Sequence, residues 1–169
     1  MSTPFGDLMA MRTVGDDEFL AEPAGHGFLY GGLTIGMALM AGAATVADGL
    51  LPMALRCSFL SFGQWGPTSV GVERVSTSRS FATRRTALRQ GDALVAVADL
   101  TFHRVEPGRD VQHTPMPPVP SPDALMPVQT RFGSADVDTV DPFEVRPQRS
   151  GDFAMAERFH PFWARMRQP

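Results

Sequence analysis

The first feature with chemical potential is the pair Gly31-Gly32, which opens a long uncharged segment. This segment, Tyr30 to Val46, is rich in Gly, Ala and Met and predicts a buried helix. The first amides of a helix have no acceptor inside the helix, so their N–H groups point into the entry loop, where a carbonyl oxygen or an anion can be held. We therefore expect Gly31 and Gly32 to contact a ligand. The alternative is that small residues here only let a strand pack closely.

Two side chains before the helix are candidates for acid–base chemistry on a bound carbonyl. His26 lies in the loop Pro23-Ala24-Gly25-His26-Gly27 and is able to donate to a carbonyl or to act as a base. Glu22 is a carboxylate beside the same loop. The plainer interpretation is that both are polar surface groups. The catalytic residues are therefore unknown, with His26 and Glu22 as the candidates.

Composition limits the class of protein. A chain of 169 residues with net charge -3 and 43% hydrophobic residues is typical of a globular domain. Its arginines are scattered among acidic residues, which gives no basic stripe for nucleic acid, and its start has no secretory pattern. The single cysteine, Cys57, excludes an internal disulfide and a thiolate metal cluster. We expect a cytoplasmic protein with no bound metal, no nucleic acid and no membrane attachment.

Strands are expected on both sides of the helix in the sequence. Two short ones form a hairpin before it and four longer ones follow it: Met9–Val14, Glu18–Pro23, Met53–Phe62, Thr68–Ser78, Phe81–Leu88 and Ala93–Val105. In Ala93–Val105 one face is apolar and the other is mixed, which is typical of an antiparallel sheet with one buried face. This order predicts an α+β fold in which an antiparallel sheet wraps around a central helix.

The composition changes at Pro107. Six prolines lie between positions 115 and 127, and proline cannot donate to a sheet ladder, so residues 107–140 are expected to form an extended linker. Phe143–Pro147 and Glu157–Arg167 again have strand character. We therefore divide the chain into a domain at 1–106, the linker at 107–140 and a C-terminal extension of two strands at 141–169. Two strands cannot form a core alone, so this extension is expected to pack on another domain or subunit.

Several stretches resemble the acyl-CoA thioesterase II family, whose members carry two fused hotdog domains. Leu29-Tyr30-Gly31-Gly32 resembles the entry to the first hotdog helix, and Cys57-Ser58-Phe59-Leu60 resembles the strand after it. Arg79-Ser80-Phe81-Ala82-Thr83-Arg84-Arg85 resembles a later strand of that domain. Phe143-Glu144-Val145-Arg146-Pro147 and Phe162-Trp163-Ala164-Arg165 resemble the opening strands of the second hotdog.

The resemblance implies a hotdog fold with an acyl-CoA thioester as substrate or ligand and no further cofactor. For such a ligand, Gly31 and Gly32 are candidates to hold the thioester carbonyl, and Tyr30 is a candidate to close the acyl pocket. Arg79 and Arg84 are candidates to bind the phosphates of coenzyme A, which arginine grips bidentately. The alternative for Tyr30 is a core or interface aromatic, and for the arginines a solvated strand face.

The sequence also departs from the family pattern. Leu33 and Met37 stand where the family usually has glutamine. The family's catalytic aspartate, threonine and glutamine lie downstream of the tryptophan-arginine segment, and no residue here matches them.

Three functions remain open. The first is an acyl-CoA thioesterase, a hydrolase of lipid metabolism that works as a homo-oligomer with sites at subunit interfaces. The second is a non-catalytic hotdog subunit that associates with a second hotdog chain carrying the catalytic half. The third is an acyl-CoA hydratase or dehydratase, which normally needs an Asp/His pair where this loop offers only His26.

Overall fold

The computed structural model describes residue 7 and residues 9–25, 27–127, 143–148 and 162–166. The chain divides into two compact units, Gly6–Pro107 and a second one that contains the described residues from Gly108 onward. The boundary lies next to the expected end of the first domain. The described residues Gly108 to Pro127, which were expected to form part of a linker, belong to the second unit. Each unit is described by itself.

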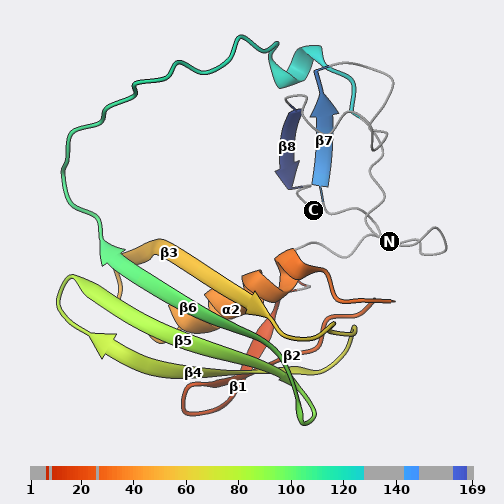
Figure 1. The fold of residues 1–169 in the computed structure, drawn as a ribbon, viewed down its shortest axis with the longest axis vertical. Helices are drawn as coiled ribbons and strands as arrows, with labels where there is room; N and C mark the ends of the chain where they lie inside the picture. The colour runs from red at the N-terminus through yellow and green to blue at the C-terminus, as the bar shows by residue number, and fades with distance from the viewer. Residues whose placement is uncertain (1–6, 8, 26, 128–142, 149–161, 167–169) are drawn as a thin grey trace. The chain divides into compact units, whose positions relative to one another are not determined.

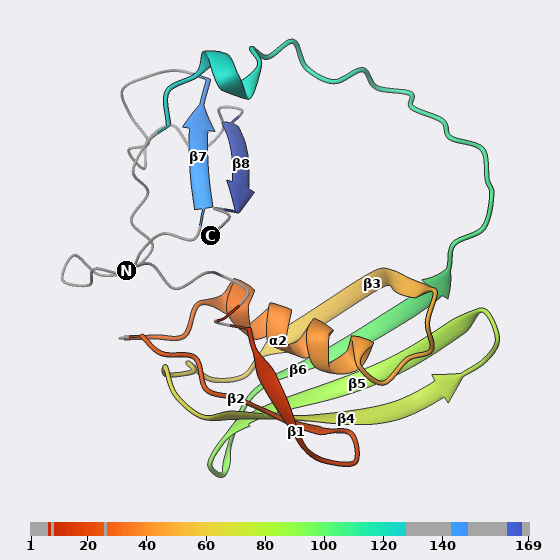
Figure 2. The same ribbon diagram turned by 180° about the vertical axis from the view of Figure 1, so that it is seen from behind.

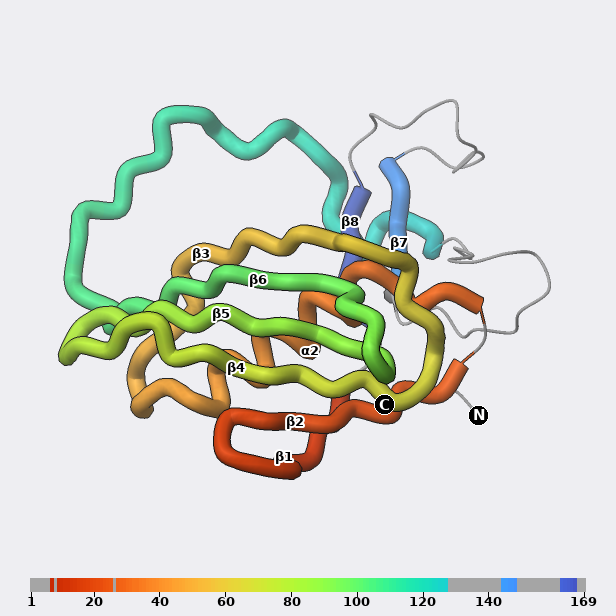
Figure 3. Tube along the Cα trace, turned by 60° about the horizontal axis from the view of Figure 1, so that its bottom comes forward, coloured from red at the N-terminus to blue at the C-terminus, as the bar shows by residue number. Residues whose placement is uncertain are grey.

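The first unit is built on a six-stranded antiparallel sheet (Figures 1 and 3). Its strands are β1 (Met11–Gly15), β2 (Glu18–Ala21), β3 (Leu50–Phe59), β4 (Thr68–Thr77), β5 (Phe81–Gln90) and β6 (Ala93–Arg104). They lie side by side in the order β1-β2-β4-β5-β6-β3, so that β3 returns to the far edge beside β6. All six expected strands are present.

The helix α2 (Gly31–Ala43) lies along one face of the curved sheet (Figure 2). Every second residue of β5 is buried beneath it, and the buried side chains of β6 include Leu100 and Phe102. A Cβ atom on Gly42 would lie 2.3 Å from Leu100 Cδ1, so glycine is what allows the helix to approach the sheet at this point. The prediction of an antiparallel sheet wrapped around one helix is confirmed.

The helix is not covered on every side within this unit. Leu33, Met37 and Ala41 face the core, whereas Met40 is 51% exposed. The apolar sequence of the helix predicted that the helix is buried on every side. In the structure the sheet covers only the side that faces the core.

β3 begins at Leu50, three residues earlier than expected. Pro52, which cannot donate to a ladder, lies within this earlier part of the strand. In the structure β3 is an edge strand, where a proline is tolerated, and the pairing with β6 shifts between Pro52 and Ala54.

The second unit contains the hairpin of β7 (Phe143–Pro147) and β8 (Phe162–Met166), paired antiparallel, and the short 3-10 helix η1 (Pro122–Ala124). The second expected strand was to begin at Glu157, and residues 157–161 lie outside the described residues. No helix in the described part of the chain is long and apolar enough to cross a membrane.

Candidate functional site

The start of α2 presents two amide donors. Tyr30 is the N-cap residue with an extended backbone, and its carbonyl oxygen accepts the N–H groups of Leu33 at 3.0 Å and Thr34 at 3.1 Å. Among the described residues, the amides of Gly31 and Gly32 have no backbone acceptor. The donors expected from the sequence are therefore available to a group outside the helix.

Two aromatic rings flank these donors. A Cβ atom on Gly32 would lie 2.4 Å from Cε1 of Tyr30, and one on Gly31 would lie 3.3 Å from Cζ of Phe59. The glycine pair thus permits close packing, and within the described residues its amides have no backbone acceptor, so the packing interpretation and the ligand interpretation are compatible. Tyr30 is 41% exposed and Phe59 is 53% exposed, which gives the donors apolar neighbours that are open to solvent.

A second aromatic pair lies just before the helix. The rings of Phe28 and Phe62 are 5.1 Å apart between centroids, and Phe62 is 82% exposed. The loop that carries Phe62 is fixed by the Leu29 N–H, which donates to the Gly63 carbonyl at 2.7 Å, and by Phe28 pairing with Gln64 as an isolated bridge.

Gln90, at the end of β5, holds the same loop from the other side. Its Oε1 accepts the Gln64 N–H at 2.9 Å, and its Nε2 donates to the Gln64 carbonyl at 2.5 Å and to Thr68 Oγ1 at 2.9 Å. Phe28, Phe62 and this use of Gln90 were not predicted from the sequence. The available signal was the Gln90-Gly91 turn, but its partner lies 26 residues earlier.

Of the two candidate acid–base residues, the structure describes Glu22. His26 lies outside the described residues. Glu22 follows β2, is exposed, and has its Oε2 3.9 Å from Nε of Arg12 across the β1–β2 hairpin. It therefore has an ion-pair partner that was not evident from the sequence, in a solvent-exposed setting where such a pair is weak.

The two arginines expected at a phosphate lie at the other end of the helix. Arg84 is 1% exposed, and its guanidinium donates to Thr45, which follows the C-terminal end of α2. Arg79 is exposed in the turn before β5, where its carbonyl accepts from Arg104. A helix of this length spans roughly 20 Å, so the structure does not bring these arginines to the amides of Gly31 and Gly32. For Arg84 the arrangement indicates a structural role, because its donors are already used inside the core.

Other reactive groups are few. Cys57 lies on β3 as a half-buried free thiol, and this burial raises its pKa. In the described ranges, no cluster of three His, Cys, Asp or Glu side chains is placed to hold a metal ion. The candidate site is therefore a pair of backbone donors with an apolar surround, which suits a molecule that joins a carbonyl group to an apolar chain or ring.

An antiparallel sheet that curves around one helix is the hotdog fold, and the chain is a hotdog protein. Residues 20–103 match the family described as the acyl-CoA thioesterase N-terminal domain. The chain is 26% identical over 163 residues to acyl-coenzyme A thioesterase 8 of Homo sapiens, and 30% identical over 99 residues to the Mus musculus protein of the same name. The chain is therefore a thioesterase II-like hotdog protein.

Solved structures show the same fold. A hotdog protein of unknown function from Alicyclobacillus acidocaldarius superimposes with a TM-score of 0.75 at 21% identity, covering 89% of this chain and 57% of that one. A tesB protein from Mycobacterium avium subs paratuberculosis gives a TM-score of 0.66 at 25% identity, covering 85% and 60%.

The relatives are longer than the matched region. The human alignment covers 82% of this chain and 50% of the relative, and the mouse alignment covers 58% and 31%. The matched part of the chain thus spans about half the length of the human protein and a smaller share of the mouse protein.

Proposed function

We propose that this hotdog unit binds an acyl-CoA thioester at the start of α2, and that the chain acts as an acyl-CoA thioesterase. The observation that carries the proposal is the match of residues 20–103 to the acyl-CoA thioesterase N-terminal domain, which includes the helix start and its two glycines.

The geometry supplies a chemical role for the helix start. A thioester carbonyl oxygen at the N–H groups of Gly31 and Gly32 gains hydrogen bonds that strengthen as negative charge develops on it during attack by water. The exposed rings of Tyr30 and Phe59 offer apolar contact for the groups beside that carbonyl. Coenzyme A enters this scheme as part of the substrate, and no further cofactor is required. The water-activating residue is not assigned, and His26 and Glu22 stay candidates.

The test is hydrolysis of short, medium and long acyl-CoA thioesters by the purified chain, with free coenzyme A measured by chromatography so that the Cys57 thiol does not interfere. Turnover that persists through re-purification and falls in the Gly32→Glu variant supports the proposal. Absence of turnover in the presence of saturable acyl-CoA binding would reject the enzymatic part and keep the binding part.

A second candidate is a non-catalytic hotdog subunit that associates with another hotdog domain, and one observation favours it. In the described sheet β3 pairs only with β6, so its other edge is open. That edge carries exposed apolar side chains, namely Leu51, Met53, Leu55 and Phe59. An open apolar edge is a surface that proteins normally cover. A homo-oligomer or a second hotdog chain would cover it.

Charge on this edge tests the association. Leu55→Lys should shift the sedimentation mass toward the monomer, while Thr83→Lys, on the interior strand β5, serves as the matched control. An unchanged mass distribution in Leu55→Lys would remove β3 as the association surface.

The remaining expectations follow from this proposal. A role in lipid metabolism and a cytoplasmic location accompany an acyl-CoA substrate. Hydratase or dehydratase chemistry stays the least supported alternative, because it would have to use His26 without an aspartate partner in its loop.

A further inference from the structure

The proline-rich segment of the second unit is held against the β7–β8 hairpin. We call residues Met116–Leu125 the strap. Trp163 Nε1 on β8 donates to the Pro120 carbonyl oxygen at 2.9 Å. Arg146 Nη1 on β7 donates to the carbonyl oxygens of Pro122 at 2.7 Å and Leu125 at 3.0 Å. The segment expected to be a plain spacer therefore makes three hydrogen bonds to side chains of the hairpin.

The donors and acceptors are chemically matched. A proline-rich backbone has carbonyl acceptors that no regular ladder uses, because proline has no N–H group and the chain stays extended. Tryptophan and arginine side chains offer only donors. Protein surfaces generally recognise proline-rich segments in the same manner, by placing aromatic rings against the segment.

Ion pairs orient Arg146, which makes two of the hydrogen bonds to the strap. Glu144 Oε1 accepts from Arg146 Nε at 2.5 Å, and Glu144 Oε2 accepts from Arg165 Nη2 at 3.1 Å. The two arginines hold the pKa of Glu144 below its usual value, so this carboxylate is ionised near neutral pH. Charge-assisted pairing of this kind orients the guanidinium toward the strap.

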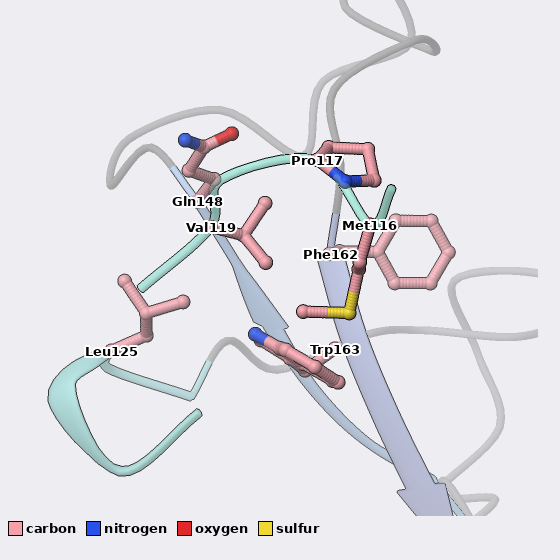
Figure 4. A pocket seen from close by; sticks show the side chains of 7 residues that line it. All are labelled: Met116, Pro117, Val119, Leu125, Gln148, Phe162 and Trp163. Atoms are coloured by element: carbon pink, nitrogen blue, oxygen red, sulfur yellow. The ribbon is translucent and has the colours of Figure 1, made fainter. Parts of the chain in front are cut away.

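Apolar contact accompanies the polar bonds. Met116, Val119 and Leu125 of the strap gather around the Trp163 ring and line a cavity of about 180 Å³ together with Pro117, Gln148 and Phe162 (Figure 4). The strap therefore covers apolar surface of a two-stranded hairpin, which such a small element needs for stability.

We propose that the β7–β8 hairpin is a recognition surface for a proline-rich segment and that its ligand is the strap of the same chain. Arg146 and Trp163 then act in holding the strap and not in acyl-CoA binding, and Glu144 orients Arg146.

Hydrogen exchange of the full chain, followed by mass spectrometry, tests the strap. Arg146→Gln and Trp163→Phe should speed exchange of the strap amides about tenfold, because each removes donors to the strap. Arg165→Gln is the matched control, since within the described residues Arg165 pairs with Glu144 alone; its strap exchange should stay within about twofold of the original chain. Trp163→Phe removes the indole N–H but keeps an aromatic side chain. This variant therefore tests the proposal if Arg146→Gln unfolds the hairpin. Unchanged strap exchange in Trp163→Phe and Arg146→Gln would overturn the proposal.

A second measurement uses a synthetic peptide of residues 114–126. It is added to a chain in which residues 116–125 are replaced by a Gly/Ser sequence of equal length, with Trp65→Phe so that Trp163 fluorescence reports alone. A saturable fluorescence change is expected, and its absence would overturn the proposal. In the original chain, strap exchange that slows with protein concentration would show that a second copy supplies the strap, which would overturn the assignment to the same chain. Neither measurement involves acyl-CoA, so the result is independent of the proposed function.

Discussion

Arg84 on β5 donates from Nε to Thr45 Oγ1 at 2.7 Å and from Nη2 to the Thr45 carbonyl oxygen at 2.9 Å. Its Nη1 donates to the carbonyl oxygens of Ser76 and Thr83 at 2.7 and 3.0 Å. Burial, and secondarily the nearby Arg74, lower the pKa of Arg84, but an arginine stays charged at neutral pH. The guanidinium lies at the C-terminal end of α2, where the negative end of the helix dipole favours a cation. Its hydrogen bonds to Thr45 connect the helix to the sheet.

Loss of Arg84 should destabilise the hotdog unit. Arg84→Ala leaves buried carbonyl oxygens without donors and opens a cavity, so we expect the free energy of unfolding to fall by about 3 kcal/mol. Chemical denaturation followed by circular dichroism measures this. Arg85→Ala is the control, because Arg85 is exposed and pairs with Asp99 on the surface. An Arg84→Ala variant as stable as Arg85→Ala would contradict the structural role.

The Tyr30–Gly32 contact predicts a change in ligand affinity. In Gly32→Ala the new methyl group would lie 2.4 Å from the Tyr30 ring, so the ring must move from the helix start. We expect acyl-CoA affinity to fall about tenfold, equivalent to about 1.4 kcal/mol. Gly36→Ala, on the same helix, meets only the flexible end of Met9 and should leave the affinity unchanged. Calorimetric titration of both variants makes the comparison, and equal affinities would place the ligand elsewhere.

The Asp17–Arg74 pair predicts a dependence of stability on acidity. Arg74 donates to both carboxylate oxygens of Asp17, at 2.7 and 2.8 Å, and these hydrogen bonds lower the Asp17 pKa below its usual 3.8. Because the unfolded chain takes up this proton more readily, the stabilisation is complete above 3.8 and is lost as the pH falls through the lower, folded-state pKa.

Thermal unfolding between pH 2 and 6 should therefore show a smaller loss of melting temperature on acidification for Asp17→Asn than for the original chain. Asparagine is the suitable replacement because Asp17 has a φ of 57°, a conformation that asparagine tolerates. If the melting temperatures of the two proteins fell equally on acidification, the Asp17–Arg74 pair would not be the cause of the pH dependence of stability.

Gln90 should control the order of the loop that carries Phe62. The variants are compared in a Trp163→Phe background, where Trp65 is the single tryptophan. Gln90→Ala removes three hydrogen bonds to Gln64 and Thr68, and we expect the fluorescence of Trp65 in the same loop to shift toward longer wavelength. A Cβ atom on Gly25 would lie 2.4 Å from the Trp65 ring, which shows how closely that ring packs. Arg89→Ala, next to Gln90 and exposed, is the control. An unchanged Trp65 spectrum in Gln90→Ala would mean that other contacts hold the loop.

Periodicity and turn residues predicted the fold well, because they report local chemistry. The uncharged helix from Gly31 and the alternation along Ala93–Arg104 each specify an element without knowledge of its neighbours, although the helix ends at Ala43 and not at the predicted Val46. Burial was harder to predict. Met40 and the edge of β3 are exposed although they are apolar, since their exposure depends on which strand lies at the edge of the sheet.

The candidate site could be predicted only in part. The helix-start amides follow from backbone geometry, so Gly31 and Gly32 could be named from the sequence. The roles of Phe28, Phe62 and Gln90 depend on contacts between distant segments, and so does the burial of Arg84 at the far end of the helix. An arginine in an alternating strand has the same local pattern whether it faces solvent or the core.

Titration calorimetry with a non-hydrolysable acyl-CoA thioether tests the proposed binding of acyl-CoA at the start of α2. We expect saturable binding to the original chain and loss of that binding in Gly32→Glu, where a charged side chain would lie at the Gly31 and Gly32 amides. Absence of binding to the folded original chain, or the same affinity in Gly32→Glu, would contradict it.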